Sequence, residues 1–187
     1  MRLAEPRIQP IELDNITAEQ RELLDGLPAP IRNFNIFTTM VRSPVAMKRF
    51  NSWGAYIGGA GTSLAPWERE LAILRTCWLC QSEYEWGHHS LNAQKCGLSV
   101  EEIGRIKAGA GAAGWASREA AILQTADDIV RDHFVSNETW VLLETFTEAE
   151  RMDLIYTVGQ YVLASTIMNT FGVQLEDYYA RDRDFHK

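Results

Sequence analysis

Hydrophobic residues in this chain recur at helical spacing, and no stretch of useful length alternates with the period of a strand. The clearest apolar stripe contains Trp67, Leu71, Leu74 and Trp78, and it follows a proline suited to the first helical position. At 187 residues the chain has the length of one ordinary domain. The pattern therefore predicts an all-α, single-domain fold.

A continuous helix from Pro66 to Lys95 would be about 45 Å long, which is long for a domain of this size. A break near Gln81 is therefore expected. Ser82 and Glu85 have the spacing of a capping box, in which two side chains hydrogen-bond to the first free backbone N–H groups of a helix. We expect a second helix to begin there and to end at Gly97.

Similar signals delimit the other helices, because serine, threonine and Ser–Pro pairs are favoured at helix starts. The predicted starts are Thr17, Ile31, Ser43, Pro66, Ser82, Ser99, Ser117, Ser136 or Asn137, and Thr147. The last helix should end at Gly172. These limits divide the chain into an N-terminal arm (1–30), a helical domain (31–178) and a charged tail (179–187).

Composition limits the partners. The net charge of −7 disfavours nucleic acid and anionic membranes, both of which need a basic surface. No apolar run approaches the ~18 residues of a membrane span, and the N-terminal residues lack the apolar core of a signal peptide. A cytoplasmic location is therefore expected, with no nucleic-acid or membrane partner, and three cysteines there imply no disulfide framework.

Glu70 is the first candidate for chemistry. On a helix it shares a face with Ile73, Leu74 and Cys77, so its carboxyl group would face the core. Burial raises the pKa of a carboxyl group toward the value that a neutral-pH acid or base needs. The alternative is a first-turn glutamate whose carboxylate lies in water and interacts with the helix dipole.

Glu85 and His89 are one helical turn apart, which suits a carboxylate that orients an imidazole. The capping box and a surface ion pair are alternative reasons for the same spacing. His88 is one step round the helix and is not expected to reach the same pocket as His89. Glu70, Glu85 and His89 do not have a recognised zinc or iron spacing, so we predict no metal.

Cys77 and Cys80 form a C-x-x-C motif, but they lie near the end of an apolar helix. The helix dipole lowers a thiol pKa at the start of a helix and not at its end. The position favours small buried side chains over a redox pair.

The runs RELAILR (69–75), SEYEWxxH (82–89) and GLSxEEI (97–103) resemble the carboxymuconolactone decarboxylase family, in the superfamily of the alkyl hydroperoxidase D-like proteins. Weaker matches extend the resemblance over residues 30–178. It implies an all-helical bundle that assembles as a trimer or a dimer of trimers, with a pocket near the central helices.

In the peroxidase branch of that superfamily, a glutamate precedes a C-x-x-C by twelve residues and a histidine follows it by four. The corresponding residues here are Glu70, Ser82, Glu85 and His89. The resemblance supports Glu70 and His89 as functional residues. Because Ser82 and Glu85 cannot form a disulfide, it excludes peroxide reduction by that route.

The resemblance implies a cofactor-free lyase or decarboxylase that acts on a small oxidised carboxylic acid or lactone. His89 would donate a proton or stabilise an enolate, Glu70 would be its acid–base partner, and Glu85 would fix the imidazole tautomer. Arg75 is the nearest candidate for binding a substrate carboxylate. The residues expected to contact the substrate are Tyr84, Trp86 and Ser82.

Two alternatives remain open at this stage. One is a thiol-dependent peroxide reductase that uses Cys77 and Cys80. The other is a helical oligomer that binds a small ligand without catalysis.

Overall fold

A computed structural model of the chain describes residues 3–186, and within this range it contains only helices, turns and irregular segments. The all-α prediction is therefore confirmed. The α-helices are α1 (Ala18–Asp25), α2 (Asn35–Met40), α3 (Pro44–Gly58), α4 (Pro66–Leu79), α5 (Glu83–Lys95), α6 (Val100–Ile106), α7 (Ser117–Asp132), α8 (Asn137–Leu142) and α9 (Glu148–Phe171). Two short 3₁₀ helices cover Leu13–Asn15 and Arg183–His186.

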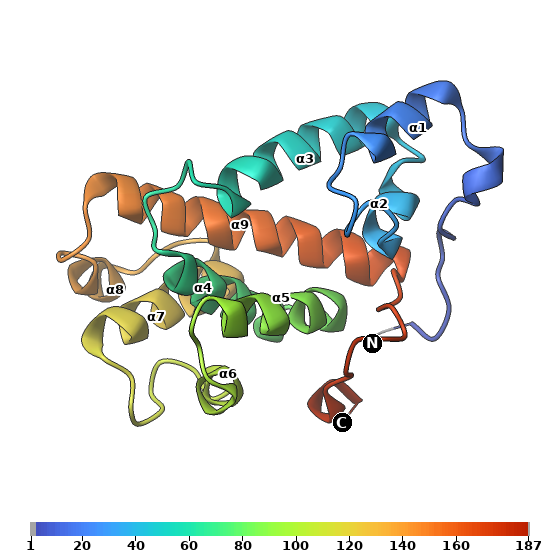
Figure 1. The fold of residues 1–187 in the computed structure, drawn as a ribbon. Helices are drawn as coiled ribbons and strands as arrows, with labels where there is room; N and C mark the ends of the chain where they lie inside the picture. The colour runs from blue at the N-terminus through green and yellow to red at the C-terminus, as the bar shows by residue number, and fades with distance from the viewer. Residues whose placement is uncertain (1–2, 187) are drawn as a thin grey trace.

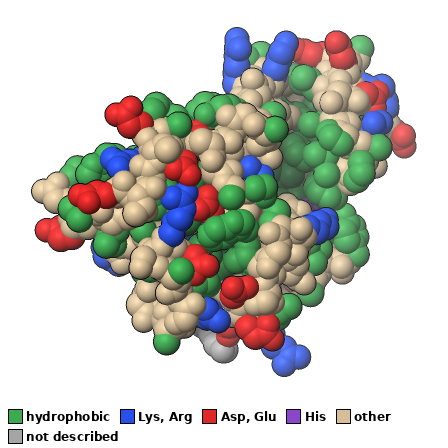
Figure 2. All heavy atoms as spheres, turned by 60° about the vertical axis from the view of Figure 1, so that its left-hand side comes forward, with side chains coloured by type: hydrophobic (Ala, Val, Ile, Leu, Met, Phe, Trp, Pro, Cys, Tyr) green, Lys and Arg blue, Asp and Glu red, His purple; other side chains and the backbone are tan. Residues whose placement is uncertain are grey.

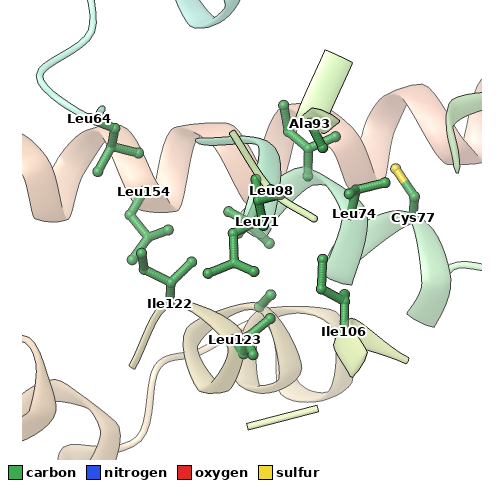
Figure 3. Packing of buried hydrophobic residues seen from close by; sticks show 14 of the residues in the cluster. Leu64, Leu71, Leu74, Cys77, Ala93, Leu98, Ile106, Ile122, Leu123 and Leu154 are labelled. Carbon is green, nitrogen blue, oxygen red and sulfur yellow. The ribbon is translucent and has the colours of Figure 1, made fainter. Parts of the chain in front are cut away.

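The long helix α9 crosses the middle of the molecule and separates two groups of helices (Figure 1). Helices α1, α2 and α3 lie on one side of it, and α4 to α8 lie on the other (Figure 1). The main core fills the space between α4, α7 and α9, where Leu71, Leu74, Ile122, Leu123 and Leu154 pack together without solvent exposure (Figure 3).

The predicted break between the two central helices is present. Gln81 adopts a left-handed backbone with φ of 54°, and the Ser82 N–H donates to the Cys77 carbonyl at 2.9 Å. Ser82 does occupy the N-cap, but its side chain makes no capping hydrogen bond. The capping box with Glu85 was therefore wrong, because the Glu85 carboxyl group turns toward His89 instead.

Most other helix limits follow the capping signals. The boxes at Thr17, Ser99 and Thr147 form both of their hydrogen bonds, and Gly172 ends α9 with φ of 72°. Two starts differ. Ala116, and not Ser117, is the N-cap of α7, and the second helix begins at Asn35 after a turn, later than predicted.

The N-terminal and C-terminal segments pack on the helical body. The Arg7 N–H donates to the Phe171 carbonyl at 2.8 Å, which places the N-terminal segment against the end of α9. In the predicted charged tail, Lys107 pairs with Asp182 at 2.6 Å and with Asp184 at 2.7 Å. Over the described range 3–186, no helix has both the length and the apolar character needed to cross a bilayer.

Leu74→Ala tests the core. Leu74 is fully buried, so truncation leaves a cavity, and we expect urea denaturation to show a loss of about 2–5 kcal/mol in the free energy of unfolding. Leu91→Ala is the matched control. Leu91 is 45% exposed on α5, and its truncation should change stability by less than about 0.5 kcal/mol. Equal effects of the two substitutions would contradict this assignment of the core.

Candidate active site

A cavity of about 540 Å³ lies between the α2–α3 side of the molecule and helices α5 and α9. The segment before α2 contributes Leu27, α2 contributes Phe37, α3 contributes Phe50, and α9 contributes Tyr161. In the space-filling view the surface is hollowed between two lobes, and hydrophobic side chains form most of the walls of the hollow (Figure 2). The volume suits a small organic molecule.

The polar groups of this cavity come mainly from the first two turns of α5. Tyr84, Glu85, His88 and His89 all line it. These residues follow directly on the reversal at Gln81, which directs this end of α5 toward the cavity. Because these groups are largely buried among hydrophobic side chains, their electrostatic interactions are stronger than in bulk water.

His89 and Glu70 form a hydrogen bond across two helices. The distance between His89 Nδ1 and Glu70 Oε2 is 2.7 Å, and the Glu70 residue is only 5% exposed. The structure thus brings together the two residues that the sequence made the main candidates. Since Nδ1–H donates to the carboxylate, neutral His89 carries its lone pair on Nε2.

Glu85 faces that second nitrogen. Its Oε2 lies 3.7 Å from His89 Nε2, beyond hydrogen-bond distance, and its buried Oε1 has no hydrogen-bond partner among residues 3–186. Burial raises the pKa of the Glu85 carboxyl group, and the charges of His89 and His88 offset this only in part. The tautomer of His89 is therefore fixed by Glu70, whereas the sequence had assigned this role to Glu85.

The pKa of His89 reflects opposing effects. Burial disfavours the charged imidazole, but the charge and hydrogen bond of Glu70, together with the charge of Glu85, raise the pKa of His89 above its ordinary value. The Tyr161 ring contacts the imidazole edge-on, with 4.8 Å between the ring centroids. Burial raises the pKa of Tyr161 well above its usual range, so its phenol is protonated at neutral pH.

His88 lines the same cavity, so the expectation that it would point elsewhere was wrong. Adjacent residues on a helix are about 100° apart around its axis, and the face of α5 that lines the cavity is wide enough to include both histidines. Each histidine pairs with a different carboxylate. His88 Nε2 lies 2.8 Å from Glu176 Oε2. Glu176 belongs to the irregular segment after α9, where no periodic pattern identifies a site residue.

Of the three residues predicted to contact the substrate, one lines the cavity and two do not. The Tyr84 ring lines the cavity, and its hydroxyl donates to Glu176 Oε1 at 3.0 Å. Trp86 and Ser82 are not among the lining residues: Trp86 packs against Trp78 at 5.8 Å, and Ser82 is fully buried.

Arg75 has a structural role. Its Nε donates to Asp127 Oδ1 at 2.7 Å, and its Nη1 donates to the carbonyls of Ile106 and Lys107. It is therefore not available to bind a substrate carboxylate. No lysine or arginine of residues 3–186 lines the cavity.

The cysteines of the C-x-x-C motif also lie outside the lining. Cys77 is fully buried in the main core, and burial raises the pKa of its thiol well above the usual range. This agrees with the role of a core side chain. In the described part of the chain, no three His, Cys, Asp or Glu side chains are grouped so that they would hold a metal ion.

Residues 44–128 match the model of the carboxymuconolactone decarboxylase family, a range that includes Glu70, Glu85, His88 and His89. No curated protein sequence matches the chain.

Several solved structures share its fold, including the following three. Two are uncharacterised peroxidase-related proteins. The one from Ralstonia eutropha JMP134, described as having an alkylhydroperoxidase AhpD core, has a TM-score of 0.80 and 19% identity over 92% of this chain and 93% of that one. The one from Silicibacter sp. TM1040 has a TM-score of 0.80 and 11% identity, over 95% and 96%. The third, a variant of the debrominase Bmp8 in complex with 2,3,4-tribromopyrrole, has a TM-score of 0.70 and 15% identity, over 93% and 94%. The fold is thus alkyl hydroperoxidase D-like.

Glu70→Gln tests the electrostatics of His89. In the wild type we expect the imidazole to titrate above the ordinary value of about 6.5, and removal of the negative charge of Glu70 should lower that midpoint. NMR of the imidazole resonances as a function of pH measures both midpoints, and the resonances of the exposed His133 should not respond to the substitution.

The same shift has a consequence for stability. A histidine whose pKa is raised by folding stabilises the folded state below its unfolded pKa, and this contribution is lost as pH rises through the folded pKa. Denaturation of the wild type should therefore show such a loss above about pH 6.5, and Glu70→Gln should reduce it. An unchanged His89 midpoint in the variant would contradict the pairing.

Proposed function

We propose that this chain, whose residues 44–128 match the model of the carboxymuconolactone decarboxylase family, is a cofactor-free acid–base enzyme acting on a small carbonyl compound. The decarboxylation of a β-keto acid or of a lactone-type acid is its first candidate reaction. One observation carries the proposal: His89 lies in the wall of an apolar cavity between two buried glutamates, one of which fixes its tautomer.

The arrangement suits each part of such a reaction. As the bond between the carboxylate carbon and the substrate breaks, CO₂ leaves and the electron pair enters the adjacent carbonyl to give an enolate. Protonated His89 donates its Nε2 proton to the enolate carbon and regains a proton from solvent. Glu70 stabilises the imidazolium and holds its orientation.

The hydrophobic walls of the cavity favour a reaction in which the substrate carboxylate loses its negative charge. A carboxylate is poorly solvated among hydrophobic side chains, and its conversion into neutral CO₂ removes that penalty. Since no cationic side chain of residues 3–186 other than a protonated histidine lines the cavity, the substrate should be largely apolar around its reacting groups.

The two alternatives have less support. A peroxide reductase that uses Cys77 and Cys80 needs a thiolate at an accessible site, whereas Cys77 is buried with a raised pKa and neither cysteine lines the cavity. A protein that only binds a ligand would have no need for a buried histidine between two carboxylates, because buried charges cost free energy.

We also propose that the chain self-associates as a trimer or a dimer of trimers. Large hydrophobic side chains are exposed on two consecutive helices, a feature typical of surfaces that associate. They are Trp140, Val141 and Leu142 on α8, and Met152, Tyr156 and Leu163 on α9.

The catalytic proposal predicts a graded loss of activity. A panel of aromatic-catabolism acids and lactones is screened for CO₂ release and for a change in ultraviolet absorbance. Against a turned-over substrate, His89→Ala should lower kcat by about 10²–10⁴-fold. Glu70→Gln should also lower kcat and should move the pH–rate profile to lower pH, because it lowers the pKa of His89.

The control is the double variant Cys77→Ala, Cys80→Ala, which should keep wild-type kcat. If this variant loses a peroxide-reducing activity that His89→Ala retains, the thiol mechanism is correct and the acid–base proposal is wrong.

The assembly proposal predicts the mass in solution. Light scattering after size-exclusion chromatography should give three or six times the chain mass of 21.2 kDa. Tyr156→Asp should lower that mass, since a charge is costly in an apolar interface. A wild-type monomer at micromolar concentration would contradict self-association.

A further inference from the structure

His88 and Glu176 form a second carboxylate–histidine pair in the wall of the cavity, and the reaction proposed above does not use it. His88 Nε2 lies 2.8 Å from Glu176 Oε2, and the two side chains are only 11% and 10% exposed. Such a pair is costly to bury unless it is held by further hydrogen bonds.

Those hydrogen bonds are present. Glu176 Oε1 accepts from the Asn35 backbone N–H at 2.7 Å and from the Tyr84 hydroxyl at 3.0 Å. The Tyr84 hydroxyl in turn accepts from the Ile36 N–H at 3.2 Å. Although burial alone would raise it, the hydrogen bonds from His88 and from the Asn35 N–H hold the pKa of Glu176 below its ordinary value. The carboxylate is therefore a fixed, charged acceptor.

The imidazole is also fixed in orientation. Three aromatic rings pack against His88, with centroid distances of 4.7 Å to Phe34, 4.6 Å to Tyr84 and 4.2 Å to Tyr179. Because Glu176 accepts from Nε2–H, neutral His88 carries its lone pair on Nδ1. That nitrogen makes no hydrogen bond to any residue from 3 to 186. Since His88 lines the cavity, Nδ1 is available to accept a hydrogen bond from a bound molecule.

We infer that His88 is a specificity-determining residue that binds a hydroxyl group of the substrate through Nδ1. This inference rests on the proposed function and names the substrate class: a small planar molecule with a carbonyl for His89 and a phenolic or enolic hydroxyl for His88. Flat ring faces suit the aromatic walls formed by Phe34, Phe37 and Phe50. Within residues 3–186, no lysine or arginine lines the cavity. A neutral hydroxyl group can bind there because it needs no cationic partner.

Binding of matched probes tests the inference without turnover. Isothermal titration calorimetry compares 4-hydroxyacetophenone with acetophenone, which differ only in the hydroxyl. The wild type should bind the hydroxylated probe about tenfold more tightly, the effect of one buried hydrogen bond to a fixed acceptor.

Two His88 variants separate the ring nitrogens. His88→Gln keeps a polar atom near the position of Nε2 and has none near Nδ1, so it should bind the two probes equally. His88→Asn keeps a polar atom near the position of Nδ1 and should retain part of the preference. Asn51→Ala, at a polar lining residue on α3, is the control and should retain the full preference.

A spectroscopic measurement on the wild type covers the case in which a variant does not fold. Nitrogen NMR should show neutral His88 protonated at Nε2, and 4-hydroxyacetophenone should shift the Nδ1 resonance while acetophenone leaves it in place. A wild type that binds neither probe at millimolar concentration, or without preference, overturns the inference, and so does a preference that persists in His88→Gln or disappears in Asn51→Ala.

These outcomes are independent of catalysis. A preference that disappears in His88→Gln supports the inference even if His89→Ala leaves every activity unchanged, a result that would refute only the proposed reaction.

Discussion

The reversal between α4 and α5 is the constraint on which the rest of the site depends. Glu70 and His89 are nineteen residues apart, and a continuous helix would place them far from each other. The left-handed backbone at Gln81 turns the chain so that α5 packs back along α4 and the two side chains meet. The same turn directs the first two turns of α5 at the cavity, so both histidines depend on it.

This geometry concentrates charge in an apolar environment, and the structure accommodates it in two ways. Each histidine has one carboxylate at hydrogen-bond distance, Glu70 for His89 and Glu176 for His88. The third carboxyl group, Glu85, has no such partner on Oε1 among the residues that the structure describes, and burial raises its pKa toward the neutral form. The charges in this cavity are neutralised by side chains held in fixed positions and not by solvent. Such an arrangement is suited to stabilise a transient charge on a substrate.

The sequence was sufficient for the features that depend on local chemistry. Helical periodicity and the capping boxes at Thr17, Ser99 and Thr147 predicted the all-α class and most helix limits. The resemblance added the pairing of Glu70 with His89, which no single helix pattern contains. The predictions went wrong where a side chain had two possible partners. Glu85 was assigned to a cap that needs a backbone contact, whereas its carboxyl group lies in the cavity.

The remaining errors have one physical cause, which is that contacts between distant segments carry no spacing signal. Glu176 follows α9, yet it meets His88 and the start of α2, over sequence separations of 88 and 141 residues. Trp86 looked suitable for a pocket, but it packs against Phe185 from the C-terminal segment. Arg75 looked available for a substrate and instead pairs with Asp127.

The candidate acid–base residues and part of the cavity wall come from different parts of the chain. Glu70, Glu85, His88 and His89 all lie within residues 44–128, the part that matches the family model. Outside that part lie much of the cavity wall and Glu176, which orients His88. The part that matches the family model thus contains the candidate acid–base groups and one side of the cavity wall, and segments outside it complete the space in which a substrate must fit. A scaffold built in this way can keep its acid–base groups while its substrate changes, which is why the fold alone does not identify the reaction.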